Sequence, residues 1–98
     1  MNRISSERLH ALRNKIPVDD LIQHALNLPC KHREGFFRFL CPACGEFNTA
    51  TNPKTNLARC FTCQRNFNTI ELVMVVRQCS FRPAVAFLEK LSSRFPGR

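Results

Sequence analysis

Apolar residues recur at helical spacing between positions 18 and 28 of the chain. Five of them fall on one helical face, namely Val18, Leu21, Ile22, Ala25 and Leu26. A proline precedes this run, another follows it, and two aspartates occupy its first turn. Because these are the usual start and stop signals of a helix, the pattern predicts an amphipathic helix over residues 18–28.

Three other stretches also favour helices. Residues 69–76 are apolar nearly all round, which is typical of a buried central helix. Asn68 precedes them, and Glu71 three positions later completes a variant of the capping box. The apolar side of residues 80–91 predicts a last helix, and residues 5–13 predict a short first helix with a thin apolar stripe.

The intervening part of the chain is β-prone. Residues 36–40 read Phe-Phe-Arg-Phe-Leu and predict a strand. Residues 47–51 and 57–61 predict two further strands, joined by the turn cluster Asn-Pro-Lys-Thr-Asn at 52–56. The run Cys-Lys-His-Arg-Glu-Gly at 30–35 is interpreted as a basic turn. Strands flanked by helices predict an α+β fold.

Four cysteines give the strongest chemical signal. Cys41 and Cys44 form one Cys-x-x-Cys pair, and Cys60 and Cys63 form a second after fifteen intervening residues. This spacing is typical of a zinc site, and four thiolates at about 2.3 Å would complete a closed, structural tetrahedron. The alternatives are two disulfides or four ordinary buried thiols. A secreted disulfide scaffold usually brings a signal peptide, and the N-terminus lacks an apolar signal core.

Two further cysteines lie outside this pattern. Cys30 and Cys79 are interpreted as small core residues rather than additional ligands. In a chain of 98 residues the core is modest, so metal binding would supply part of the free energy that stabilises the fold. Reduced thiols and the N-terminal sequence lead us to expect a cytoplasmic protein.

Positive charge is the second strong feature. Lysine and arginine number 15 against 7 acidic residues, a formal net charge of +8, which four thiolates and one Zn²⁺ would lower by about two units. Basic proteins of this kind usually bind a polyanion, most often nucleic acid. An acidic membrane surface and a merely solubilising surface are the alternatives, although no basic amphipathic helix with a large apolar side is evident.

Basic and aromatic residues near the cysteine pairs form the candidate nucleic-acid contacts. They share positions on the predicted strands and turns and are Lys31, Arg33, Arg38, Lys54, Arg59, Phe61 and Arg65. Lys31 and Arg33 belong either to a solvated loop or to a phosphate-binding patch. Phe61 is either a base-stacking platform or a core residue beneath the metal.

The order of these motifs resembles the zinc-binding domain of bacterial and phage DNA primases. The matching segments are residues 41–44 (Cys-Pro-Ala-Cys), 60–63 (Cys-Phe-Thr-Cys), 68–74 and 80–85, and the resemblance spans residues 17–91. Cys44 stands where the cellular primases carry histidine, so this chain resembles the four-cysteine variant found in some phage members.

A second departure from the family pattern lies just after the second cysteine pair. Gln64 stands where the family usually has glycine, and we expect the second turn to be altered there.

The resemblance implies a zinc ribbon with flanking helices that recognises single-stranded DNA at the start of primer synthesis. The boundaries we expect are an arm or short helix at 1–16, the zinc-binding domain at 17–92 and a frayed tail at 93–98. The seven acidic residues are scattered, whereas nucleotidyl transfer needs clustered carboxylates around two Mg²⁺ ions. The chain is therefore predicted not to be an enzyme alone but to act beside a primase catalytic subunit or a helicase. The alternative is a protein-interaction zinc ribbon.

Overall fold

The computed structural model describes residues 4–33 and 35–92. Its elements, in chain order, are α1 (Ser6–Asn14), α2 (Val18–Asp20), the π-helical segment η1 (Leu21–Ala25), β1 (Cys30–Arg33), β2 (Phe36–Phe39), β3 (Thr49–Asn52), β4 (Leu57–Cys60), β5 (Arg65–Phe67), α3 (Thr69–Arg77) and α4 (Phe81–Ser92). The α+β class is therefore confirmed. The frayed tail expected at 93–98 lies outside the described residues.

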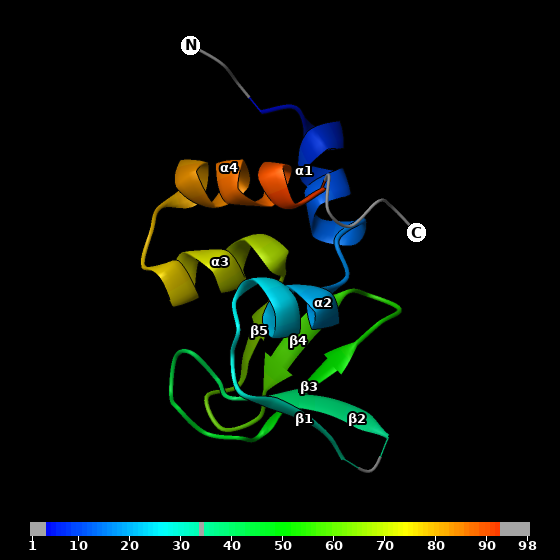
Figure 1. Ribbon diagram of the computed structural model, residues 1–98, viewed down its shortest axis with the longest axis vertical. Helices are drawn as coiled ribbons and strands as arrows, with labels where there is room; N and C mark the ends of the chain where they lie inside the picture. The colour runs from blue at the N-terminus through cyan, green and yellow to red at the C-terminus, as the bar shows by residue number, and fades with distance from the viewer. Residues whose placement is uncertain (1–3, 34, 93–98) are drawn as a thin grey trace.

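Helices α1, α3 and α4 lie at one end of the molecule and the strands at the other, while α2 lies nearer the strands (Figure 1). Helices α1, α3 and α4 pack on one another, and α3 follows directly from β5. The strands form an antiparallel hairpin, β1–β2, and a three-stranded antiparallel sheet of order β3–β4–β5. Strands β2 and β3 lie against each other, so the two small sheets meet at that edge.

The core fills the space between the helices and the strands. Its largest fully buried apolar side chains come from every layer of the fold and are Phe39, Phe67, Ile16, Leu21, Ile22, Leu72 and Leu88. Helix α3, predicted as the central helix, begins at the capping box of Asn68 and Glu71: each residue's side chain accepts a hydrogen bond from the other's backbone N–H, at 2.8 Å and 3.0 Å.

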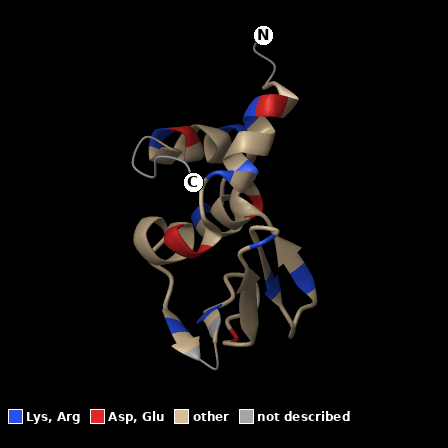
Figure 2. Cartoon of the chain, turned by 90° about the vertical axis from the view of Figure 1, so that its right-hand side faces the viewer, with Lys and Arg blue, Asp and Glu red and all other residues tan. Residues whose placement is uncertain are grey.

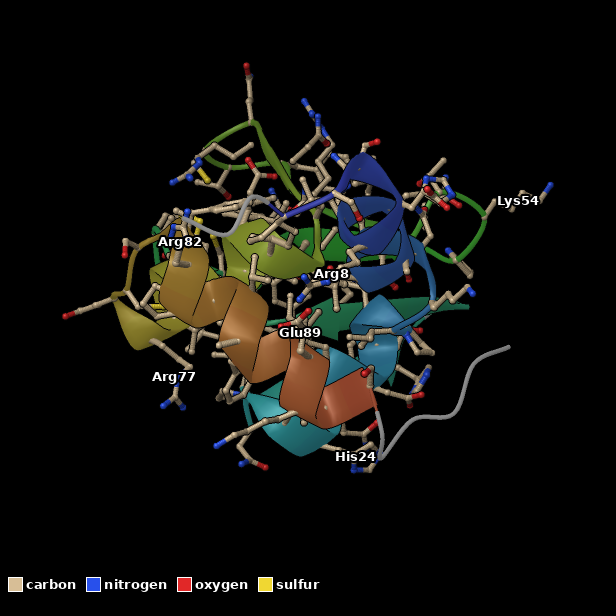
Figure 3. All side chains as sticks on the ribbon, turned by 90° about the horizontal axis from the view of Figure 1, so that it is seen from above. Arg8, His24, Lys54, Arg77, Arg82 and Glu89 are labelled. Atoms are coloured by element: carbon tan, nitrogen blue, oxygen red, sulfur yellow. The ribbon has the colours of Figure 1, made fainter. Side chains whose placement is uncertain are left out.

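Helix α1 belongs to the helical layer. Ser5 caps it by accepting a hydrogen bond from the backbone N–H of Arg8. Its Leu12 is buried, and the Thr69 hydroxyl of α3 donates to the Leu12 carbonyl at 2.7 Å. Arg8 also forms an ion pair with Glu89 of α4, and the two side chains approach each other in Figure 3.

The helix expected over residues 18–28 differs from its prediction in length and type. Its buried face is present, because Val18, Leu21 and Ile22 are all in the core. After Asp20, however, the backbone widens into η1, where the N–H of Leu26 donates to the carbonyl of Leu21, five residues back, at 2.8 Å. Asn27 then takes a left-handed conformation, with φ of 53°, and such a residue ends a helix.

The prediction of a basic turn at residues 30–35 is wrong for most of that run. Cys30–Arg33 is strand β1, which pairs with β2 so that Lys31 lies opposite Arg38 and His32 opposite Phe37. The reversal falls after Arg33, where Gly35 has φ of 81°. The run lacks apolar alternation because Lys31 and His32, on opposite sides of this strand, are both exposed, so only its pairing with β2 reveals it.

Candidate metal centre and the adjoining groove

Each cysteine pair lies on a tight turn at the end of a strand. Cys41 follows β2, and its carbonyl accepts a hydrogen bond from the N–H of Gly45 at 2.8 Å. Cys60 is the last residue of β4, and the chain turns through Cys63 before β5 begins. The Asn48 side chain donates to the Thr62 hydroxyl at 3.2 Å, which joins the loop after the first turn to the second turn.

The residue after each pair has a left-handed backbone. Gly45 has φ of 76° and Gln64 has φ of 56°. Glycine adopts this conformation without cost, whereas a side chain with a Cβ is strained by about 1–2 kcal/mol. Gln64 therefore makes the same turn as a glycine would, and its departure from the family pattern costs free energy rather than altering the fold.

The four sulfurs converge on one point. The Sγ atoms of Cys41, Cys44, Cys60 and Cys63 all lie within 4.8 Å of one another. The Sγ atoms of Cys41 and Cys63 are 3.9 Å apart, and those of Cys44 and Cys60 are 3.5 Å apart. A zinc–sulfur distance of about 2.3 Å implies a sulfur–sulfur spacing near ~3.8 Å in a tetrahedron. The donor set therefore fits one zinc ion, and these separations are too long for disulfides.

Electrostatics in the cluster also favours a cation. Burial raises the pKa of Cys60, but hydrogen bonds from the Cys63 backbone and from the other three thiols lower it to about 7. The Glu46 backbone lowers the pKa of Cys44, yet desolvation and hydrogen bonds to Cys60 and Cys41 raise it to about 12. Desolvation, with the same neighbours, raises the pKa of Cys63. One thiol ionises at the expense of the others, so a divalent cation is needed to hold four thiolates.

Neither of the remaining cysteines belongs to this cluster. Cys30 lies on β1 and Cys79 follows α3, and both are partly buried against the core. Their interpretation as core residues rather than ligands agrees with this placement.

A groove of about 810 Å³ adjoins the metal centre on the outer side of the three-stranded sheet. Strand β4 explains its lining: Ala58 and Cys60 are buried, whereas Leu57, Arg59 and the following Phe61 point outward, as expected when side chains alternate along a strand. Phe61 is 49% exposed, which excludes a position beneath the metal. The hairpin adds His32 and Phe37, whose rings contact edge-to-face at 5.1 Å.

Three of the seven candidate nucleic-acid contacts line this groove, namely Lys54, Arg59 and Phe61. Lys54 lies in the β3–β4 turn and projects away from the body of the molecule in Figure 3. The Arg59 guanidinium lies 5.7 Å from the Phe61 ring centroid. Several polar residues of the lining were not among the candidates, and they include Asp19 and Asn66. Asn66 lies in β5, a strand that the sequence did not predict.

Three further candidates, Lys31, Arg38 and Arg65, lie on other surfaces. Lys31 and Arg38 form a cross-strand pair on the opposite side of the hairpin from His32. There the Lys31 ammonium lies 4.8 Å from the Phe47 ring centroid, and the Arg38 guanidinium donates a hydrogen bond to the Thr49 carbonyl. Arg33 also lies in β1.

Arg65 lies on the opposite side of the sheet from Arg59. It pairs with the buried Cys60, and its guanidinium lies 4.8 Å from the Phe67 ring centroid. Figure 2 shows the lysines and arginines distributed over strands and helices alike. The alternation of the strands thus separates Arg38 and Arg65 from Lys54 and Arg59.

Together, the paired cysteine turns and the small antiparallel sheets define a four-cysteine zinc ribbon with flanking helices. The chain matches the family model of the CHC2 zinc finger, the zinc ribbon of DnaG-type primases, over residues 4–94. It belongs to this family, and the site holds one structural zinc ion. Comparison with curated proteins gives no significant match. None of the helices in the described part of the chain has the length and apolarity to span a bilayer.

Proposed function

We propose that the chain binds single-stranded DNA in the groove on the outer side of the β3–β4–β5 sheet. The observation that carries this proposal is the lining of the groove: two cationic side chains, Lys54 and Arg59, line it together with the exposed ring of Phe61. A cationic groove with an aromatic platform is the usual arrangement for binding single strands. The net charge of +8 and the primase-type family support the same function.

Each of these side chains has a separate role in the proposed complex. Lys54 and Arg59 neutralise phosphates and release counterions, which makes the affinity depend on salt. Phe61 offers a face for one base, and such stacking contributes about 1–3 kcal/mol. Lys31, Arg38 and Arg65 are left out of this contact set because none of them lines the groove.

The zinc ion acts on this surface through the fold. Bound zinc supplies four metal–sulfur bonds that close both cysteine turns. Phe61 lies inside the second turn, between Cys60 and Cys63, and its backbone N–H donates to the Asn48 carbonyl at 2.8 Å. The metal centre therefore sets the position of the stacking ring without taking part in chemistry.

We assign primer synthesis to a separate catalytic subunit or replication partner. A polymerase site needs clustered carboxylates, whereas the acidic residues of this chain are spread singly apart from Asp19 and Asp20. With few contacts in a single groove, the affinity for DNA alone is expected to be modest, and a partner that binds the same strand would raise it by multivalency.

Fluorescence anisotropy with zinc-loaded protein tests the proposal on single-stranded DNA, duplex DNA and RNA of equal length. Single-stranded DNA is expected to bind best, with a log–log salt slope near −1.4, because each of two phosphate contacts contributes about −0.7. Arg59→Glu should abolish binding. Arg65→Glu, the matched charge reversal on the other side of the sheet, should weaken it only slightly.

Two outcomes would reject the proposal. One is the absence of single-strand binding at low salt, and the other is equal binding by the Arg59→Glu and Arg65→Glu proteins. In either case a protein-interaction ribbon, the alternative indicated by the sequence, becomes the better description.

A further inference from the structure

Two polar side chains meet across strands in the wall of the groove. Arg59 on β4 lies directly opposite Asn66 on β5 in the sheet register. The Arg59 Nη1 donates a hydrogen bond to Asn66 Oδ1 at 3.1 Å. Both residues line the groove next to Phe61, so a base stacked near that ring would meet their side chains.

The hydrogen bond fixes the orientation of the Asn66 amide. A guanidinium group has donors and no acceptor, so the amide oxygen must face Arg59 and the amide nitrogen must point away from it. Asn66 is exposed, and its Nδ2 has no hydrogen-bond partner within residues 4–33 and 35–92. The pair therefore offers the groove a set of free donors: the Asn66 NH₂ group and the remaining N–H groups of Arg59.

A surface of adjacent donors discriminates among the bases. Guanine presents two neighbouring acceptors, N7 and O6, on one edge. Adenine replaces O6 with an amino group, which would place a donor against a donor. On the corresponding edge, cytosine presents its N4 amino donor and thymine presents one acceptor beside a methyl group. A purine also covers more of the Phe61 ring than a pyrimidine does.

The Arg59 side chain is restrained before any ligand binds. It is half-buried, it is tied to Asn66, and its guanidinium lies 5.7 Å from the Phe61 ring centroid. A restrained side chain loses little conformational entropy on forming a hydrogen bond, which favours specific recognition over loose phosphate contact.

We propose that Arg59 and Asn66 form a guanine-selective site within the groove, donating hydrogen bonds to N7 and O6 of one base of the bound strand. This inference rests on the proposed single-strand binding and adds a base preference to it. It makes Asn66 a specificity-determining residue, with Arg59 serving both the base and the charge of the strand.

The test measures anisotropy of thymidine 12-mers that carry one central dG, dA, dC or dT, with the full chain loaded with zinc. The dG oligonucleotide is expected to bind about tenfold more tightly than the other three, the effect of one bidentate base contact. Two analogues locate the contact. 7-Deazaguanine lacks the N7 acceptor and should lose the preference, whereas hypoxanthine keeps N7 and O6 and should retain it.

Variants separate recognition from general binding. Asn66→Ala should remove the preference for dG, so that the dG and all-thymidine 12-mers bind this variant with equal affinity. Asn14→Ala, at an exposed asparagine on α1 that does not line the groove, should retain the preference. Zinc content and circular dichroism would verify the fold of both variants.

The results distinguish this inference from the function on which it rests. Equal binding of all four oligonucleotides, a preference for another base, or an undiminished affinity for 7-deazaguanine overturns the guanine site and leaves single-strand binding standing. Absence of binding to every oligonucleotide overturns both.

Discussion

Asn56 joins the N-terminal segment to the sheet, and we expect its removal to destabilise the whole domain. It closes the β3–β4 turn, is 8% exposed and has φ of 55°. Its Oδ1 accepts a hydrogen bond from the backbone N–H of Val18 at 2.8 Å. Its Nδ2 donates to the carbonyls of Arg13 and Ile16, both at 2.7 Å. One side chain thus forms hydrogen bonds with three backbone groups where α1 is connected to α2.

The cost of Asn56→Ala follows from these contacts. Three hydrogen bonds are lost, each worth about 1 kcal/mol net, and the partners left buried raise the cost further. Alanine in a left-handed conformation adds about 1 kcal/mol, because asparagine tolerates that region better. We therefore expect the free energy of unfolding to fall by about 3–5 kcal/mol. A domain of this size has only about 5–15 kcal/mol in total.

Urea denaturation followed by circular dichroism measures this loss, with the free zinc concentration held constant so that metal binding contributes equally to every variant. Asn56→Gly removes the same hydrogen bonds without the backbone strain and should cost about 1 kcal/mol less than Asn56→Ala. Asn52→Ala is the matched control in the same turn, since the exposed side chain of Asn52 accepts one hydrogen bond, from the Lys54 N–H. Equal losses for Asn56→Ala and Asn52→Ala would refute the reasoning.

Three further predictions concern the metal centre. Gln64→Gly should raise the free energy of unfolding by about 0.5–1 kcal/mol, because relief of the left-handed strain exceeds the entropy cost of glycine. The control is Gln23→Gly, in a helical segment, which should lower the free energy of unfolding by about 1 kcal/mol in the same urea titration. Elemental analysis should find less than one zinc per chain in Cys60→Ser but one in Cys30→Ser and in Cys79→Ser, and equal loss in Cys30→Ser would contradict the ligand assignment. Zinc binding releases thiol protons, so zinc affinity should fall as the pH is lowered from about 8 to about 6, and a competing chromophoric chelator that detects no change would contradict this.

The features predicted correctly are those encoded by residues close together in the sequence. The spacing of each cysteine pair specifies a tight turn, and the capping box at Asn68 needs only the residues up to Glu71. The turn at 52–56 with its flanking strands is likewise a local pattern of proline, asparagine and β-prone residues. Local chemistry of this kind is visible without knowledge of the fold.

The features that were missed depend on pairing between distant segments. Strands β1 and β5 carry no apolar alternation, and each exists because a neighbouring strand supplies its hydrogen-bond partners. Thr49 shows the same limit: its hydroxyl accepts from the Phe39 N–H and donates to the Phe39 carbonyl, which joins the two sheets across ten residues. A single threonine gives no sign in the sequence of where it will bond.

The groove follows from the same pairing. Basic and aromatic residues were recognisable from the sequence, but the side of the sheet that each occupies is set by the register of β4 with its neighbours. Arg59 and Arg65 are six positions apart and yet lie on opposite sides. A shift of one residue in the register of β4 would move Arg59 to the side of Arg65, so the strand pairing, and not the composition, decides which cations share a surface.

The two sides of strand β4 contribute separately to the stability of the fold and to the binding that we propose. Ala58 and Cys60 lie in the core, with Cys60 holding the metal, while Arg59 and Phe61 face the groove. Substitution of an outward residue leaves the core and the zinc ligands unchanged, so it should lower the free energy of unfolding far less than substitution of Ala58 or Cys60. The groove-facing side of this zinc ribbon is therefore free to vary while the zinc, the buried threonines and Asn56 keep the sheet in register. The recognition that we propose for the groove would depend on side chains that the core of the fold does not require.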